Sequence, residues 1–188
     1  QIDLISPFPE SQQGRLWGWN KAFSNLTMPD DGPQTKEEFE VYMAEYLATP
    51  TVTSFGIIDR DNLLEMPHVA PLVGIIVFER AGKYNGYLHV ATTRAAWGTR
   101  MVDQAGAVTI EHMFQQEPTL YRVSASINDT LAPAKALARR IGFKFEGLLR
   151  KALPVGGVMY DVAHFGLLQE DWRYAPAPVV LRRHKEKR

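Results

Sequence analysis

The sequence predicts an α/β fold in which a mixed β-sheet carries helices on both faces. Residues 120–150 give the first indication, because a strand-like run, a helical stripe, a glycine and a second strand-like run follow one another. A second helical stretch, within 97–116, separates the strand-like runs 86–92 and 120–127. Two strand–helix–strand crossovers require parallel pairing, whereas the short turns between other strands favour hairpins, so the sheet is expected to be mixed.

The first half of the chain is expected to contain two helices. The first is irregular and lies within 11–23, and the second begins after Thr35, whose side chain can form a capping box with Glu38. A run of almost unbroken apolar residues at 69–78 is typical of a strand that is buried on both faces. The expected strands of this half are 2–5, 51–58 and 69–78.

The second half is expected to alternate strands and helices. In the helix within 131–141, Pro133 falls in the first turn and Gly142 provides the left-handed stop. The pair Gly156-Gly157 predicts a tight turn before the last strand. The expected strands of this half are 86–92, 120–127, 143–150 and 158–168.

Composition indicates an ordinary globular domain over 1–172, followed by a Pro-rich and basic tail, 173–188, whose end at 182–188 is expected to be frayed and solvated. The chain has 188 residues, of which 45% are hydrophobic, and its 21 Lys and Arg balance 21 Asp and Glu. This balance argues against a dedicated nucleic-acid binder. The absence of cysteine excludes disulfides and a Cys nucleophile and is consistent with a cytoplasmic protein. Neither a membrane-spanning run nor a signal-peptide pattern is present.

Common catalytic motifs are absent. The five histidines show no metal-binding spacing, so no metal site is expected. Neither a Walker loop, nor GxSxG, nor GxGxxG occurs, which argues against a P-loop NTPase, a serine hydrolase and a Rossmann dehydrogenase.

The C-terminal half resembles the GNAT N-acetyltransferase superfamily, which transfers an acetyl group from acetyl-CoA to an amine. An Asn after a strand, an Ala-rich helix and a Gly-Phe-x-x-Glu-Gly-x-x-Arg run are similar to the ribosomal-protein and small-molecule branches. The matching positions are Asn128, Gly142, Phe143, Glu146, Gly147 and Arg150, with Asp161 and the closing residues 164–172. The resemblance covers about residues 35–172. It implies the GNAT fold, acetyl-CoA as co-substrate, and an amine of a small molecule, peptide or protein as acceptor.

The resemblance also implies where acetyl-CoA binds: at the N-terminus of the long helix, where free N–H groups and the helix dipole attract the pyrophosphate. In the family's loop, Arg/Gln-x-x-Gly-x-Gly/Ala, only Gly98 is kept here; the arginine is displaced to Arg94, and Arg100 replaces a small residue. The implied cofactor-binding residues are Val90, Ala91, Arg94, Trp97, Gly98, Thr99, Arg100 and Asn128.

The catalytic residues expected on the same grounds are His89 and Ser126. His89 lies on the fourth strand, from which family bases often come, and its usual pKa suits an amine near neutral pH. Ser124 and Ser126 share one face of the fifth strand and could bond a thiol or a water. All three side chains could equally be ordinary strand residues. The family's usual acid, which protonates the leaving thiolate, is replaced by Ala138 and Leu131.

Three hypotheses follow. The first is an active N-acetyltransferase, in which Trp17, Trp19 and Phe23 either line the acceptor cleft or pack in the core. The second is a GNAT fold that has lost catalysis and serves as a structural or binding subunit, for example of a viral particle, which would place it in a virion. The third is another α/β enzyme or ligand-binding module. A homo-oligomer is compatible with each, and neither a membrane nor a nucleic-acid partner is expected.

Overall fold

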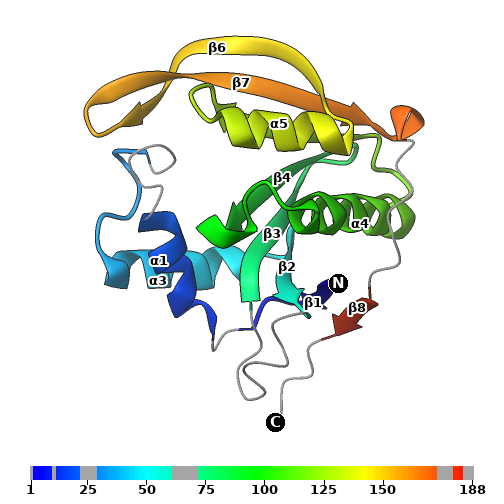
Figure 1. The fold of residues 1–188 in the computed structure, drawn as a ribbon. Coiled ribbons are helices and arrows are strands. Elements are labelled where there is room, and N and C mark those ends of the chain that lie inside the picture. Colours follow the sequence, from blue (N-terminus) through cyan, green and yellow to red (C-terminus); the bar gives the residue numbers. More distant parts are fainter. Residues whose placement is uncertain (1, 10–11, 22–28, 61–71, 173–179, 184–188) are drawn as a thin grey trace.

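The computed structural model describes residues 2–9, 12–21, 29–60, 72–172 and 180–183. Their strands form one eight-stranded sheet in the order β6-β7-β5-β4-β3-β2-β1-β8 (Figure 1). The first four strands pair antiparallel with their sequence neighbours, and the short turn between the third and the fourth gives the hairpin that the sequence predicts. They are β1 (Ile2–Ser6), β2 (Val52–Asp59), β3 (Leu72–Ala81) and β4 (Asn85–Thr92).

The expected parallel pairing occurs between β4 and β5 (Arg122–Asn128), which are joined through the long helix α4 (Arg100–Gln116). The second crossover differs from the expectation. It runs from β5 through α5 (Ala132–Ile141) to β6 (Lys144–Val155), but β7 (Val158–Leu168) lies between β5 and β6 and pairs antiparallel with both. A tight Gly156-Gly157 turn, with positive φ at both glycines, allows this hairpin to fold back.

Helices cover both faces, as the sequence predicts. On one face, α4 and α5 bury a cluster that includes Phe55, Phe78 and Phe165. On the other, α1 (Gly14–Lys21) and α3 (Lys36–Leu47) pack Leu16 and Phe39 against the central strands (Figure 1). The sheet therefore separates two cores, and any opening in it connects the two faces.

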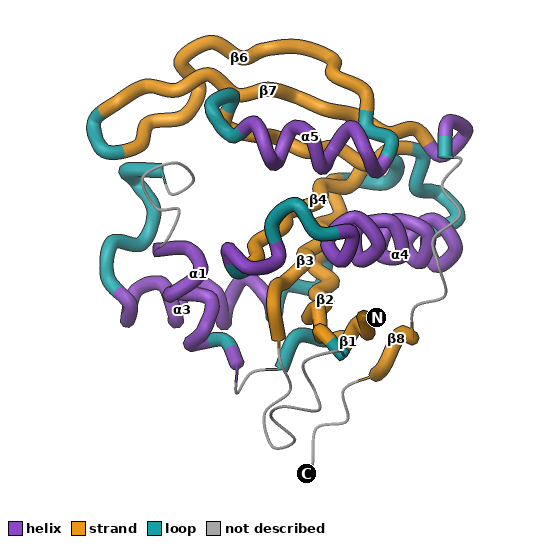
Figure 2. The backbone as a smooth tube through the Cα atoms, in the orientation of Figure 1, coloured by secondary structure: helices purple, strands orange, loops and turns teal. Residues whose placement is uncertain are grey.

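Local sequence signals account for the helix ends. The capping box of Thr35 and Glu38 is present, and Gly142 has a left-handed φ of 112°. The long helix begins at Arg100, three residues later than expected, because a short 3-10 turn, η3 (Arg94–Ala96), and a loop precede it (Figure 2).

The C-terminal segment differs from the expected frayed tail. After the 3-10 turn η4 (Gln169–Asp171), Val180–Arg183 forms the strand β8, which pairs parallel with β1 at the edge of the sheet. Only tertiary contact with β1 explains this strand. The other tail residues, as well as Phe23 and the side chain of Trp19, lie outside the described part of the chain.

A loop before α3 holds the tip of the β6–β7 hairpin. The Asp30 carboxylate accepts hydrogen bonds from the backbone N–H groups of Gly156 (2.5 Å) and Gly157 (3.0 Å), and the Asp30 N–H donates to the carbonyl of Pro154. These contacts join the α1–α3 side of the molecule to the far end of β6 and β7.

Candidate functional site

The site begins where β4 and β5 part. Their pairing is confined to Asn85–Arg122, Gly86–Val123 and Tyr87–Ser124, although β4 continues to Thr92 and β5 to Asn128. Beyond Tyr87 and Ser124, the facing edges of the two strands leave backbone groups without a partner in the other strand. The two strands therefore splay apart beyond this point.

A cavity of about 160 Å³, here called the loop cavity, lies beside the end of β4. It is formed by the last residues of β4, the loop before α4, the first turn of α4, and one side of α5 along its length. Its lining residues are Val90, Ala91, Thr92, Ala96, Trp97, Gly98, Thr99, Val102, Leu131, Pro133, Ala134, Leu137 and Arg140.

The N-terminus of α4 faces this cavity without a side-chain cap. Thr99 is the N-cap residue, but its hydroxyl donates to the Ala96 carbonyl (2.7 Å) instead of accepting from the helix. Gly98 has a φ of 70°, and a Cβ placed on it would meet no atom within 4 Å. The first N–H groups of an α-helix have no intrahelical partner, so this end is suited to an anion.

Arg140 brings a cation to the same cavity from α5. Its guanidinium donates to both carboxylate oxygens of Asp103, in the first turn of α4, at 2.8 Å each, and these hydrogen bonds raise the pKa of Arg140 further. The sequence analysis missed Arg140, because its spacing from Gly98 carries no signal. Only the packing of α5 beside α4 brings the two together.

A second cavity of about 340 Å³, here called the cleft cavity, occupies the gap between β4 and β5 under α5. It shares Val90, Leu131, Ala134 and Leu137 with the loop cavity, so the two adjoin. Its other lining residues are Leu88, His89, Ala125, Ser126, Ile127, Asn128, Ala138, Ile141, Phe143, Leu153 and Val162.

His89 and Ser126, the two predicted catalytic residues, both line this cavity. Partial burial lowers the pKa of His89. The carboxylate of Glu79 lies 3.6 Å from Nε2 and raises this pKa, which offsets part of the effect of burial. With 53% of its side-chain surface exposed, the ring keeps access to water. The imidazole therefore favours the neutral form, which can accept a proton.

Glu79 is in turn held by Tyr46 of α3, whose hydroxyl donates to Oε2 at 2.9 Å. Burial, together with this hydrogen bond to Glu79, raises the pKa of Tyr46, so the phenol stays protonated as a donor. Tyr46, Glu79 and His89 form a chain of polar contacts from α3 to the cleft cavity.

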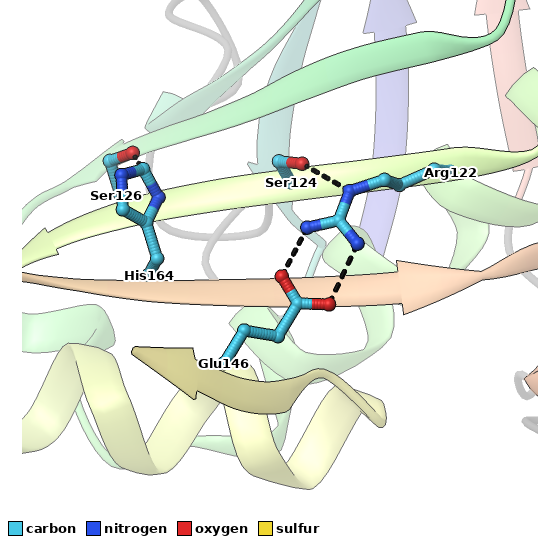
Figure 3. A network of polar contacts seen from close by, with 5 residues as sticks. All are labelled: Arg122, Ser124, Ser126, Glu146 and His164. Carbon is cyan, nitrogen blue, oxygen red and sulfur yellow. Dashed lines mark hydrogen bonds and ion pairs between the residues drawn. The ribbon is translucent and has the colours of Figure 1, made fainter. Parts of the chain in front are cut away.

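Polar residues from three strands extend the face of the sheet that carries Ser126 (Figure 3). The Ser126 hydroxyl lies 3.1 Å from Nδ1 of His164 on β7. Arg122 makes a bidentate pair with Glu146 of β6, and its Nε donates to Ser124 at 3.0 Å.

Asn128 lies at the end of β5 and lines the cleft cavity, where its side chain shapes a turn. Its Oδ1 accepts from the backbone N–H and the hydroxyl of Thr130, at 3.0 and 2.8 Å. The N-cap residue of α5 is Leu131, which makes no side-chain cap.

The remaining predicted residues are placed as follows. Val90, Ala91, Trp97, Gly98 and Thr99 line the loop cavity, whereas Arg94 and Arg100 are exposed and do not line it. Ala138 and Leu131 line the cleft cavity as apolar groups. Trp17 packs against Phe39, with ring centroids 5.4 Å apart, and belongs to the α1–α3 core.

Solved structures share this fold over nearly the whole chain. A spermidine N-acetyltransferase from Vibrio cholerae, in complex with CoA and spermine, matches with a TM-score of 0.74 and 14% identity, over 92% of this chain and 98% of that one. A ribosomal-protein-S5-alanine acetyltransferase from Vibrio fischeri matches at 0.69 and 17%, over 93% and 95%. A probable GNAT-family acetyltransferase from Chromobacterium violaceum matches at 0.69 and 20%, over 87% and 79%. The chain has the GNAT fold.

Sequence comparison adds less. A segment of 69 residues is 28% identical to an uncharacterized N-acetyltransferase of Bacillus subtilis, but it spans 37% of this chain and 40% of that protein. No family model matches the chain. At these identities, the likeness to solved GNAT structures establishes the fold, and the chemistry has to be argued from the site.

The described part of the chain offers neither a metal-binding group of side chains nor a membrane-spanning helix. No group of three or more His, Asp or Glu side chains there could hold a metal ion. None of the helices that the structure describes is both long and apolar enough to cross a membrane.

Proposed function

We propose that this chain is an N-acetyltransferase that transfers the acetyl group of acetyl-CoA to an amine of a small molecule, peptide or protein. The observation that carries the proposal is the parting of β4 and β5 above two adjoining cavities, one of which ends at the uncapped N-terminus of α4. An extended donor with an anionic end and a reactive end matches this shape, because the anion needs free N–H groups and the reactive end needs the open sheet.

The loop cavity would hold the donor's pyrophosphate. Gly98 leaves open space beside the helix N-terminus, and Arg140 supplies a guanidinium that can pair with phosphate oxygens. Arg94 and Arg100 are exposed near the same loop and would add longer-range attraction. The unpaired backbone edge at Val90 and Ala91 would accept the amide groups of the pantetheine arm.

The cleft cavity would hold the reacting groups. An amine must be neutral to attack the thioester, and His89 would take its proton, directly or through a water, because its lowered pKa favours the neutral imidazole. Glu79 and Tyr46 would orient the ring. Ser126 would contact the reacting sulfur or carbonyl from the opposite strand. Asn128 would support the wall of the cavity through its turn.

We also infer the wider setting of the reaction. Residues 1–172, together with β8, would act as a single catalytic domain, and acetyl-CoA, a cytoplasmic metabolite, makes the cytoplasm the expected location. Spermidine and ribosomal proteins, which the structural neighbours are named for, are the first acceptors to test.

A second candidate function is a donor-binding protein without turnover. It is favoured by the apolar side chains of Ala138 and Leu131, which line the cleft cavity where the family places its acid. Such a protein would bind CoA but release no thiol, and would serve as a structural or binding subunit.

Isothermal titration with CoA and acetyl-CoA, followed by thiol release with polyamines and with peptides that have free N-termini, tests these alternatives. Binding with turnover supports the enzyme, and binding without turnover on every amine supports the second candidate. Absence of binding at millimolar ligand contradicts both. Gly98→Val should weaken binding, because its Cβ branches would crowd the helix end. Gly82→Val is the matched control, since Gly82 has a similar φ of 75° and an equally open position in the β3–β4 turn.

A further inference from the structure

The cleft cavity lacks an acid on α5, so the proton that the leaving thiolate needs must come from elsewhere. Ala138 and Leu131 carry no proton donor. The polar side chains that line the cavity are His89, Ser126 and Asn128. The Asn128 side chain is a neutral amide, which does not give up a proton to a thiolate, and His89 is placed to receive the proton of the amine. Ser126 is the remaining candidate.

Ser126 and His89 occupy equivalent positions on the two strands that part. Tyr87 and Ser124 are the last paired residues, and His89 and Ser126 each lie two residues further along. Because side chains alternate along a strand, Tyr87, His89, Ser124 and Ser126 share one face of the sheet. His89 and Ser126 therefore flank the opening from its two sides.

A serine hydroxyl alone is a poor acid, but Ser126 has a partner that can resupply its proton. His164 of β7 stands directly opposite Ser126 in the antiparallel pairing of β5 and β7. Its Nδ1 lies 3.1 Å from the Ser126 Oγ (Figure 3). When Nδ1 carries a proton, it donates to Oγ, and the hydroxyl hydrogen is then free to point into the cavity.

A carboxylate of the neighbouring strand β6 lies within electrostatic reach of His164. Glu146 of β6 lies on the same face of the sheet as Ser126 and His164 (Figure 3). Arg122, and to a smaller extent His164 itself, lower the pKa of Glu146, so it remains a carboxylate. Gly166 makes room for this arrangement, because a Cβ there would overlap both Glu146 and Arg122.

We propose that His164 and Ser126 form a proton relay that protonates the leaving thiolate and replaces the acid missing from α5. As the C–N bond forms and the C–S bond breaks, the Ser126 hydroxyl gives its proton to sulfur and receives the Nδ1 proton of His164. The amine gives one proton to His89. His164 then takes up one proton from solvent and His89 releases one to solvent, so both side chains return to their starting states. Ser126 is the catalytic residue, and His164 is a positioning residue that acts through it. This inference rests on the proposed acetyltransferase function.

The first test measures kcat and the KM for acetyl-CoA in Ser126→Ala, His164→Gln and the double variant. Each single change should lower kcat about a hundredfold, at the lower end of the usual range for general acids, and leave the KM for acetyl-CoA within about twofold. Because His164 acts through Ser126, the double variant should be no slower than Ser126→Ala alone. Additive losses, or a raised KM with unchanged kcat, would overturn the relay. His112→Gln, on α4 beside Phe55, controls for losing an imidazole elsewhere.

The second test separates an acid from a merely structural role. An acetyl ester of 4-nitrothiophenol releases a weakly basic thiolate that leaves without protonation. The variants should therefore match the wild type with this donor while remaining slow with acetyl-CoA. Equal losses with both donors would show that Ser126 and His164 serve packing or the acceptor, which refutes the inference. If the wild type binds CoA but transfers no acetyl group to any amine, the proposed function fails first, and the two failures are distinct.

Discussion

Arg140 offers the sharpest test of the loop cavity as a pyrophosphate site. A hydrogen bond to a charged group contributes about 1.5–3 kcal/mol, and 47% of the Arg140 side chain is exposed, so solvent reduces this to about 1.4 kcal/mol. Arg140→Gln should therefore weaken CoA binding about tenfold. The variant also leaves the Asp103 carboxylate, which is only 14% exposed, without its partner beside the anion site, and this adds to the loss.

Asp103→Asn should act in the opposite direction. It frees Arg140 from its bidentate pair and removes a negative charge from the N-terminus of α4. CoA should therefore bind a few-fold more tightly. The helix itself loses about 0.3–1 kcal/mol of dipole stabilisation. The variant that carries both changes should bind CoA with an affinity between those of Arg140→Gln and Asp103→Asn.

Isothermal titration with CoA at low and high salt provides the measurement. Lys36→Gln on α3 is the control, because it removes one positive charge from a surface pair on the opposite face of the sheet. If Arg140→Gln binds CoA as tightly as the wild type, or if Asp103→Asn weakens binding, the pyrophosphate does not lie in the loop cavity.

Three further predictions concern the loop, the base and the core. Gly98→Ala should lower the free energy of unfolding by about 1 kcal/mol, measured by urea denaturation, because its φ of 70° is unfavourable for a side chain; an unchanged midpoint would contradict that conformation. Glu79→Gln should move the acidic limb of kcat/KM to lower pH, because Glu79 raises the pKa of His89; a limb that moves to higher pH, or not at all, argues against His89 as the base. Gly86→Ala should destabilise the protein by about 1–3 kcal/mol, since its Cβ would overlap the buried ring of Phe78, and thermal unfolding at an unchanged temperature would refute this packing.

Local signals in the sequence were sufficient for most of the fold. Caps, prolines and glycines act within a few residues, so the capping box at Thr35 and the stop at Gly142 could be predicted directly. The unbroken apolar run of β3 indicated a strand covered on both faces, and Ile75 and Ile76 are indeed buried in opposite cores.

The pairing of distant segments could not be predicted from the sequence. The insertion of β7 between β5 and β6 depends on a hairpin that folds back, and β8 is a strand only because β1 provides an edge. The residues of one strand do not indicate which strand it pairs with, because the pairing is made by backbone hydrogen bonds that every residue type except proline can form.

The candidate site divides in the same way. The sequence by itself determined the scaffold, the glycine at the helix end, and the absence of a tyrosine or serine acid at Ala138 and Leu131. Only the tertiary structure brought Arg140 to the loop cavity and His164 to Ser126, from residues that lie 42 and 38 positions away from Gly98 and Ser126. Local propensity acts over a few residues, whereas a site is assembled where separate elements pack. The parting of β4 and β5 therefore had to be seen before its chemistry could be proposed.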